Sequence, residues 1–115
     1  MPYQDLKERT KQFSLLVIKL CANLPKNQTT QILSNQLLRS ATSIGANYRE
    51  ADMAYSKKDF AAKISICLKE ASETCYWLEL LIESESCQVD QTVPLLDEAT
   101  ELTKILFTIS KNSKA

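Results

Sequence analysis

The sequence contains no histidine among its 115 residues. Without histidine, the chain cannot build His general bases, His metal ligands, or Ser-His and Cys-His nucleophile pairs. Glycine occurs once and proline three times, whereas sheet proteins need turn residues at short intervals. This shortage of turn residues favours a few long helices joined by few loops.

The sequence also lacks a long apolar run. The longest purely aliphatic stretch is Leu15–Ile18, whereas a membrane span needs about 20 apolar residues. The first five residues do not have the basic-then-apolar order of a signal peptide. We therefore expect a cytoplasmic protein that does not contact the membrane.

The cysteines are few and widely spaced, and no pair has Cys-x-x-Cys spacing. Together with the absence of histidine, this spacing argues against a zinc site. We expect reduced thiols, no metal and no cofactor. The four cysteines are Cys21, Cys67, Cys75 and Cys87.

Composition and charge fit one soluble domain over residues 1–115, with 44% hydrophobic and 24% charged residues. The formal net charge is zero, but the charge is unevenly distributed. Residues 1–69 carry eleven Lys or Arg against five Asp or Glu, and residues 70–115 carry three against nine. Such halves can neutralise each other within one subunit or pair between subunits.

Apolar residues recur at helical spacing in four segments. The first segment ends at Leu24–Pro25, and Asn27 fits the N-cap of the second. Ser56–Asp59 has the pattern of a capping box that opens the third helix. The fourth helix is predicted to start at Thr92–Pro94, because proline is tolerated in a first turn.

The predicted core consists of the periodic apolar positions of these segments. Four helices of about 20 to 30 residues with short connections predict an all-α, antiparallel up-down-up-down four-helix bundle. The core positions are Leu6, Phe13, Leu16, Val17, Leu20, Leu24, Leu33, Leu37, Ala41, Ile44, Tyr48, Ala51, Phe60, Ile64, Cys67, Ala71, Cys75, Leu78, Ile82, Leu95, Ala99, Leu102, Leu106 and Ile109.

Residues 40–47 form a poor helix sequence inside a helical pattern. Gly45 alone costs about 1 kcal/mol relative to alanine in a helix interior. Ala41 and Gly45 lie four residues apart and make a smooth patch on which another backbone can approach closely. Local conflicts of this kind occur at packed helix crossings or at ligand sites, and we favour close packing.

A polar stripe follows one flank of the second helix, with residues spaced by three, four, four and three positions. A short turn near residue 55 places Arg39 opposite residue 71, within reach of Glu70 or Glu73. The stripe is interpreted as a structural ion pair with hydrogen bonds, or as a contact surface for a partner. Its members are Gln36, Arg39, Ser43, Asn47, Glu50, Glu70 and Glu73.

These residues also carry a resemblance. Residues 36–51, together with Lys58–Phe60, Leu68–Thr74 and Leu24–Pro25, resemble a bacterial four-helix-bundle family that includes proteins encoded by intervening sequences within 23S ribosomal RNA genes. The resemblance implies a small cytoplasmic bundle that assembles as a homopentamer, with no established catalytic activity. A distant relative, the accessory protein of diversity-generating retroelements, is a basic pentamer that binds nucleic acid and a reverse transcriptase.

Two functions follow from these observations. The first is a non-catalytic oligomeric scaffold that binds copies of itself or a partner protein. The alternative is a protein that binds RNA or DNA through a basic corner between the second and third helices, formed by Arg49, Lys57, Lys58 and Lys63. A di-iron enzyme is disfavoured, because bundle sites of that kind use Glu-x-x-His motifs.

The third helix has apolar residues turned away from its core face, and these predict an oligomer interface. Ile66, Trp77 and Leu80 are expected to be largely exposed in a monomer, and exposed apolar patches mark interfaces. Tryptophan is enriched at interface hot spots.

Overall fold

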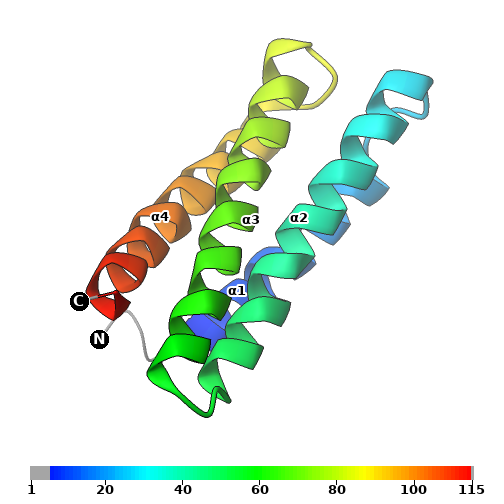
Figure 1. Ribbon diagram of the computed structural model, residues 1–115. Helices are drawn as coiled ribbons and strands as arrows, with labels where there is room; N and C mark the ends of the chain where they lie inside the picture. Colours follow the sequence, from blue (N-terminus) through cyan, green and yellow to red (C-terminus); the bar gives the residue numbers. More distant parts are fainter. Residues whose placement is uncertain (1–5, 115) are drawn as a thin grey trace.

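The computed structural model describes residues 6–114, and these fold into four helices: α1 (Leu6–Ala22), α2 (Gln28–Asp52), α3 (Lys57–Glu83) and α4 (Val89–Ser113). Successive helices run in opposite directions (Figure 1). The predicted all-α, up-down-up-down bundle is confirmed. Residues 1–5, which are expected not to form a signal peptide, and residue 115 lie outside the described residues.

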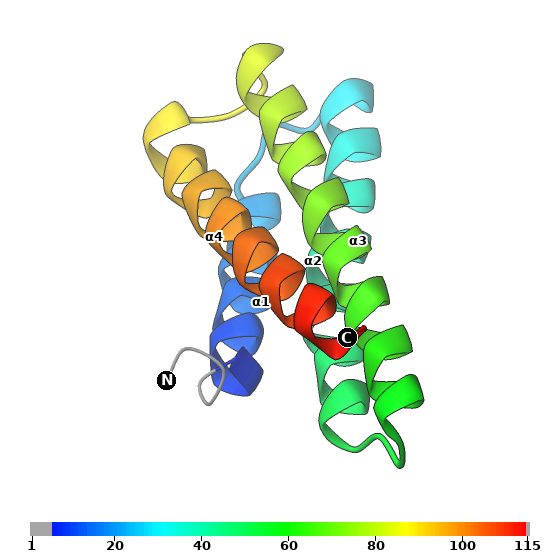
Figure 2. The same ribbon diagram turned by 60° about the vertical axis from the view of Figure 1, so that its left-hand side comes forward.

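The bundle is elongated, with extents of 45 × 22 × 20 Å. Helix α1 packs on α2, α2 on α3, and α3 on α4, while α1 meets α4 over a smaller area, so α1 lies diagonally across from α3. Helix α4 runs obliquely to the others (Figure 2). The start of α1, the α2–α3 turn and the end of α4 share one end of the bundle, called the turn end below (Figure 1).

The predicted N-caps of α2 and α3 are both present. The side chain of Asn27 accepts a hydrogen bond from the backbone N–H of Thr30 at 2.9 Å. The hydroxyl of Ser56 accepts one from the backbone N–H of Asp59 at 3.0 Å. These bonds satisfy donors that the first turn of a helix leaves free.

The predicted start of α4 is wrong, because the helix begins at Val89 and not at Thr92. The backbone N–H and the hydroxyl of Thr92 both donate to the carbonyl of Gln88, at 3.1 and 2.9 Å, and close a turn ahead of Pro94. Pro94 therefore lies in the second turn. Residues 89–91 lack apolar periodicity, so the pattern gave no signal for this first turn.

Most of the predicted core is buried, with exceptions on α1, α2 and α3. Leu16 is 51% exposed, because four consecutive apolar residues point around the whole helix and only Val17 faces the core. Near the end of α3, Leu81 is buried in place of the predicted Ile82, which is half-buried. Cys75 is also half-buried. Leu33 and Phe60 are also only partly buried.

Close packing at Ala41 and Gly45 is confirmed. A Cβ atom on Gly45 would lie 3.2 Å from Oγ1 of Thr10 on α1, and the hydroxyl of Ser14 lies 3.4 Å from the carbonyl of Ala41. The residues that weaken the helix locally are therefore the ones that allow α1 to approach α2.

None of the helices in residues 6–114 combines the length and the apolar character needed to cross a membrane.

Candidate functional site

The polar stripe of α2 meets α3 through ion pairs. Arg39 lies 3.2 Å from Glu70 and 2.8 Å from Glu73, as the register predicted. Further along, Glu50 lies 2.9 Å from Lys63. The amide of Asn47 donates to the carbonyl of Ser43 at 2.8 Å and so stays within α2. Gln36 is exposed.

The Arg39 cluster lies at the surface. The side chain of Arg39 is 50% exposed, that of Glu73 is 38% exposed, and that of Glu70 is 12% exposed. The hydrogen bond from Arg39 lowers the pKa of Glu73. Burial raises the pKa of Glu70, and this effect outweighs the opposing attraction of Arg39. The two carboxylates therefore shift in opposite directions.

These shifts predict opposite effects of two matched substitutions. A lowered pKa stabilises the fold above the unfolded pKa, and this gain is lost as pH falls through the folded pKa. Glu73→Gln is therefore expected to lower the free energy of unfolding at pH 7 by less than about 1 kcal/mol, the usual range for a surface pair. A raised pKa has the opposite sign, so Glu70→Gln should leave that free energy unchanged or raise it. Urea denaturation at pH 7 measures both, and equal losses would contradict the assignment.

The predicted basic corner does not form one cluster. Lys63 is paired with Glu50 at 2.9 Å, whereas Arg49 lines a groove on the other side of α2, together with Lys7 and Lys11 of α1. Lys57 and Lys58 open α3 at the turn end. Sequence reasoning missed Lys7 and Lys11, because only the packing of α1 on α2 brings them to Arg49.

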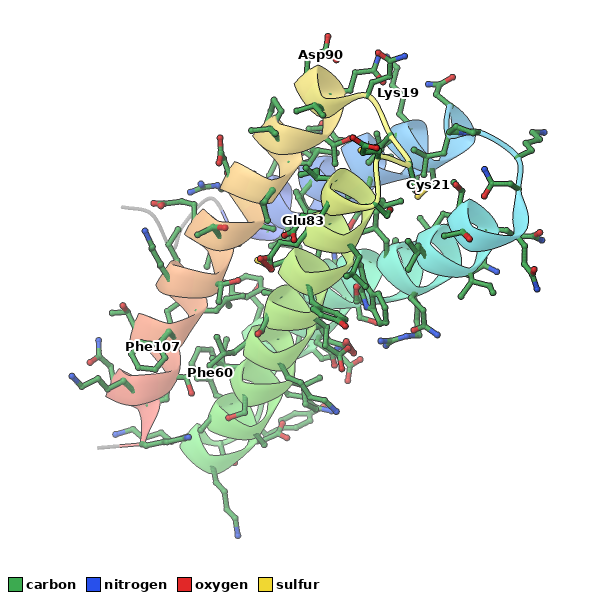
Figure 3. The ribbon with its side chains drawn as sticks, turned by 90° about the horizontal axis from the view of Figure 1, so that it is seen from above. Lys19, Cys21, Phe60, Glu83, Asp90 and Phe107 are labelled. Carbon is green, nitrogen blue, oxygen red and sulfur yellow. The ribbon has the colours of Figure 1, made fainter. Side chains whose placement is uncertain are left out.

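Charge is polarised along the axis of the bundle. Among the described residues, seven cations near the turn end make no ion pair: Lys7, Lys11, Arg49, Lys57, Lys58, Lys111 and Lys114. The opposite end carries Glu83 and Asp90, with Lys19 between α1 and α4, while Phe60 and Phe107 lie toward the turn end (Figure 3). The excess of Lys and Arg in residues 1–69 therefore contributes to a positively charged turn end in the folded bundle.

The exposed apolar surface differs from the prediction. Ile66 is exposed as expected, but Trp77 and Leu80 are half-buried. Trp77 packs against the core, and its indole N–H is buried with no hydrogen-bond partner in the described part of the chain. Helix α1 instead exposes Leu15 and Ile18, at 48% and 46%, in addition to Leu16.

A shallow apolar groove runs between α1 and α4, with a volume of about 350 Å³. Its apolar lining comes from Leu16, Leu20, Pro94 and Leu95. Next to it, the guanidinium of Arg9 makes a two-pronged ion pair with Glu98 at 2.7 and 2.8 Å, which joins α1 to α4. The groove and the exposed side of Leu16 form one continuous apolar flank, called the α1/α4 flank below.

All four cysteines are free thiols. Burial raises the pKa of Cys21 to about 11 and that of Cys67 to about 12, so both are protonated at neutral pH. Residues 6–114 hold no group of three or more Cys, Asp or Glu side chains placed to bind a metal ion.

The fold and these surfaces define a class of protein: a small four-helix bundle with apolar grooves and unpaired cations on its surface. The model of the 23S rRNA-intervening sequence protein family matches residues 4–108, and the chain belongs to this family. It is similar to the crystal structure of a protein with unknown function from the S23 ribosomal protein family of Bacteroides thetaiotaomicron VPI-5482. The two are 43% identical with a TM-score of 0.84, over 92% of this chain and 98% of that chain. No curated protein matches the sequence.

Proposed function

We propose that this chain is a non-catalytic, cytoplasmic scaffold that assembles with copies of itself, with a homopentamer as the unit. The observation that carries the proposal is the apolar surface that a single chain leaves in water. Leu15, Leu16 and Ile18 on α1 and Ile66 on α3 are all exposed, and large exposed apolar patches mark protein–protein contacts. The number five rests on the family resemblance alone.

The two apolar areas suit a head-to-tail contact. The α1/α4 flank is a shallow groove whose leucine and proline side chains are bordered by Lys19, Asn23 and Gln91. Ile66 lies on the same side of α3 as the half-buried Trp77 and Leu80, which complete the predicted interface about 17 and 21 Å further along the helix axis. Because α1 and α3 occupy diagonal corners, one copy can present Ile66 to the flank of the next. Contacts between two different patches generate rings when the rotation between copies closes.

A non-catalytic role is supported by the state of the acidic side chains. Arg39 binds Glu70 and Glu73, and Arg9 binds Glu98. Carboxylates held in this way by arginine serve as structural partners that join one helix to the next.

Light scattering coupled to size-exclusion chromatography tests the assembly. The wild-type chain is expected to elute at about five times the 13.0 kDa mass of one chain. Leu16→Glu combined with Ile66→Glu should give a smaller species that is still helical by circular dichroism, because each change places a charge in the apolar contact. Met53→Glu is the control, since Met53 is exposed outside both areas. A wild-type mass of 13.0 kDa at micromolar concentration would contradict the proposal.

Nucleic-acid binding is the second candidate, and the unpaired cations of the turn end favour it. Lys57 and Lys58 lie at the N-terminus of α3, where the helix dipole adds positive potential. A few phosphate contacts give weak, salt-sensitive binding, which repetition around a ring strengthens. The same chromatography repeated with a short RNA at low salt distinguishes this candidate, and reversal of both lysines to glutamate should abolish any complex.

A further inference from the structure

A second groove, between α1 and α2, combines an apolar floor with a basic rim. It has a volume of about 350 Å³. The floor consists of Ser14, Leu15, Thr42, Gly45 and Ala46, and the rim carries the cations of Lys7, Lys11 and Arg49. This groove is separate from the α1/α4 flank and from Ile66.

The floor behaves as an apolar surface although it contains two hydroxyl groups. The hydroxyl of Thr42 donates to the carbonyl of Leu38 at 2.7 Å. The hydroxyl of Ser14 donates to the carbonyl of Thr10 at 3.1 Å. The Ser14 hydroxyl also lies 3.4 Å from the carbonyl of Ala41 on α2, so both donors are engaged by backbone carbonyls of the two helices that form the groove. The small, exposed side chain of Ala46 leaves space for an approaching side chain from a partner, whereas Gly45 is covered by Thr10 of α1.

The rim has uncompensated positive charge. Neither Lys7, Lys11 nor Arg49 forms an ion pair within residues 6–114, and no carboxylate lines the groove. Lys7 and Lys11 lie one helical turn apart, about 6 Å along α1. Beyond the floor, the exposed side chain of Ile18 extends the apolar surface of Leu15 along α1.

We propose that this groove binds an amphipathic helix of a partner protein. Apolar side chains of that helix, one turn apart, enter the floor, and its carboxylates pair with Lys7, Lys11 and Arg49. Helix-in-groove recognition of this kind reads apolar anchors at helical spacing, and complementary charge fixes the orientation of the partner. The partner contact lies outside the α1/α4 flank and Ile66, the two areas that meet in the self-assembly proposed above, although it includes Leu15 of the exposed apolar surface of α1.

The chemistry of the floor favours an acidic helix over a nucleic acid. Proteins that bind single strands stack bases on aromatic side chains, and no aromatic residue lines this groove. A phosphate would pair only with the cations of the rim, because the floor offers it carbon atoms and hydroxyl groups that already donate elsewhere. An amphipathic helix satisfies both the apolar floor and the charged rim.

Fluorescence anisotropy with a synthetic peptide tests the proposal on the full chain. The probe is a fluorescein-labelled helical peptide with leucines at i, i+4 and i+7 and glutamates beside them. It is expected to bind the wild-type chain. Lys7→Glu with Lys11→Glu should weaken binding by about tenfold or more, as reversed charges do at a complementary interface. Ala46→Trp should weaken it similarly by filling the floor, and Ala46 is exposed, so the fold tolerates the change.

The matched control is Lys57→Glu with Lys58→Glu, which makes the same charge change at the same end of the bundle outside the groove. This control should keep peptide affinity within about twofold, because distant exposed charges are screened. Failure of the peptide to bind, equal losses in both double variants, or equal binding of a peptide with serine in place of leucine would overturn the proposal. A labelled RNA that binds the groove while the peptide does not would also overturn it.

Light scattering on the same variants separates this proposal from the assembly. An unchanged mass with lost peptide binding supports a distinct partner site. If Lys7→Glu with Lys11→Glu dissociates the assembly, the groove is a contact between copies of this chain, and the partner proposal is wrong. If the wild-type chain is a monomer that still binds the peptide, the assembly proposal fails and the groove proposal stands.

Discussion

Replacement of Gly45 by valine is expected to lower the free energy of unfolding by about 1 to 3 kcal/mol, the usual cost of overpacking a well-filled contact. A Cβ atom at this position would lie 3.2 Å from Oγ1 and 3.4 Å from Cβ of Thr10. The two methyl groups of valine extend further toward α1. The helices must then separate or Thr10 must shift, and Gly45 is buried, so no solvent space is available. Chemical denaturation measures the loss.

Two further variants isolate the cause. Ala46→Val places the same side chain one residue later at an exposed position, and surface changes usually stay within about 0.5 kcal/mol. Thr10→Ala combined with Gly45→Val should recover part of the loss, because it removes the nearest atom. Equal losses at residues 45 and 46 would mean that helix propensity, and not the α1–α2 contact, sets the effect.

A second large effect is expected for Leu102→Ala on α4. Leu102 is completely buried, and truncation of a buried leucine costs about 2 to 5 kcal/mol, from lost burial and the cavity left behind. The expected result is a large fall in the midpoint of urea unfolding with an unchanged slope.

Leu16→Ala is the matched control for Leu102→Ala, because the sequence pattern assigns both leucines to the core. Leu16 is 51% exposed, so its truncation should cost less than about 1 kcal/mol in a single chain, since little apolar area leaves a buried environment. A larger loss that depends on protein concentration would mean that assembly covers Leu16. A large loss independent of concentration would contradict the assigned rotation of α1.

The helices and their caps could be predicted because they depend on contacts within a few residues. The bonds at Asn27 and Ser56 span three positions each, and the short α2–α3 turn fixed the register of Arg39 against Glu70 and Glu73. The start of α4 at Val89 was not predicted, because its first turn carries neither of the local signals used for the other helices. Its first turn contains no apolar repeat, and it is closed by the hydroxyl and the N–H of Thr92.

Side-chain exposure was harder to predict, because a helical pattern gives the angle of a side chain but not the angle at which its helix sits in the bundle. Leu16 was predicted to be buried and is exposed, whereas Trp77 was predicted to be exposed and is half-buried. Leu16 turned outward once Val17 occupied the core face, whereas Trp77 turned inward to pack on the core. Each outcome depends on the volumes that three other helices contribute, and packing resolves these only collectively.

The sequence by itself determined four helices, their approximate ends, the close approach at Gly45 and the pairing across the α2–α3 turn. Only the tertiary structure decided which charges and apolar groups share a surface. It separated Lys63 from Arg49 by pairing Lys63 with Glu50, and it joined Arg49 to Lys7 and Lys11 around one groove. The physical reason is range: capping and helical periodicity act over a turn or two of chain. A groove between α1 and α2 instead brings together residues far apart in sequence, and it exists only after both helices have docked.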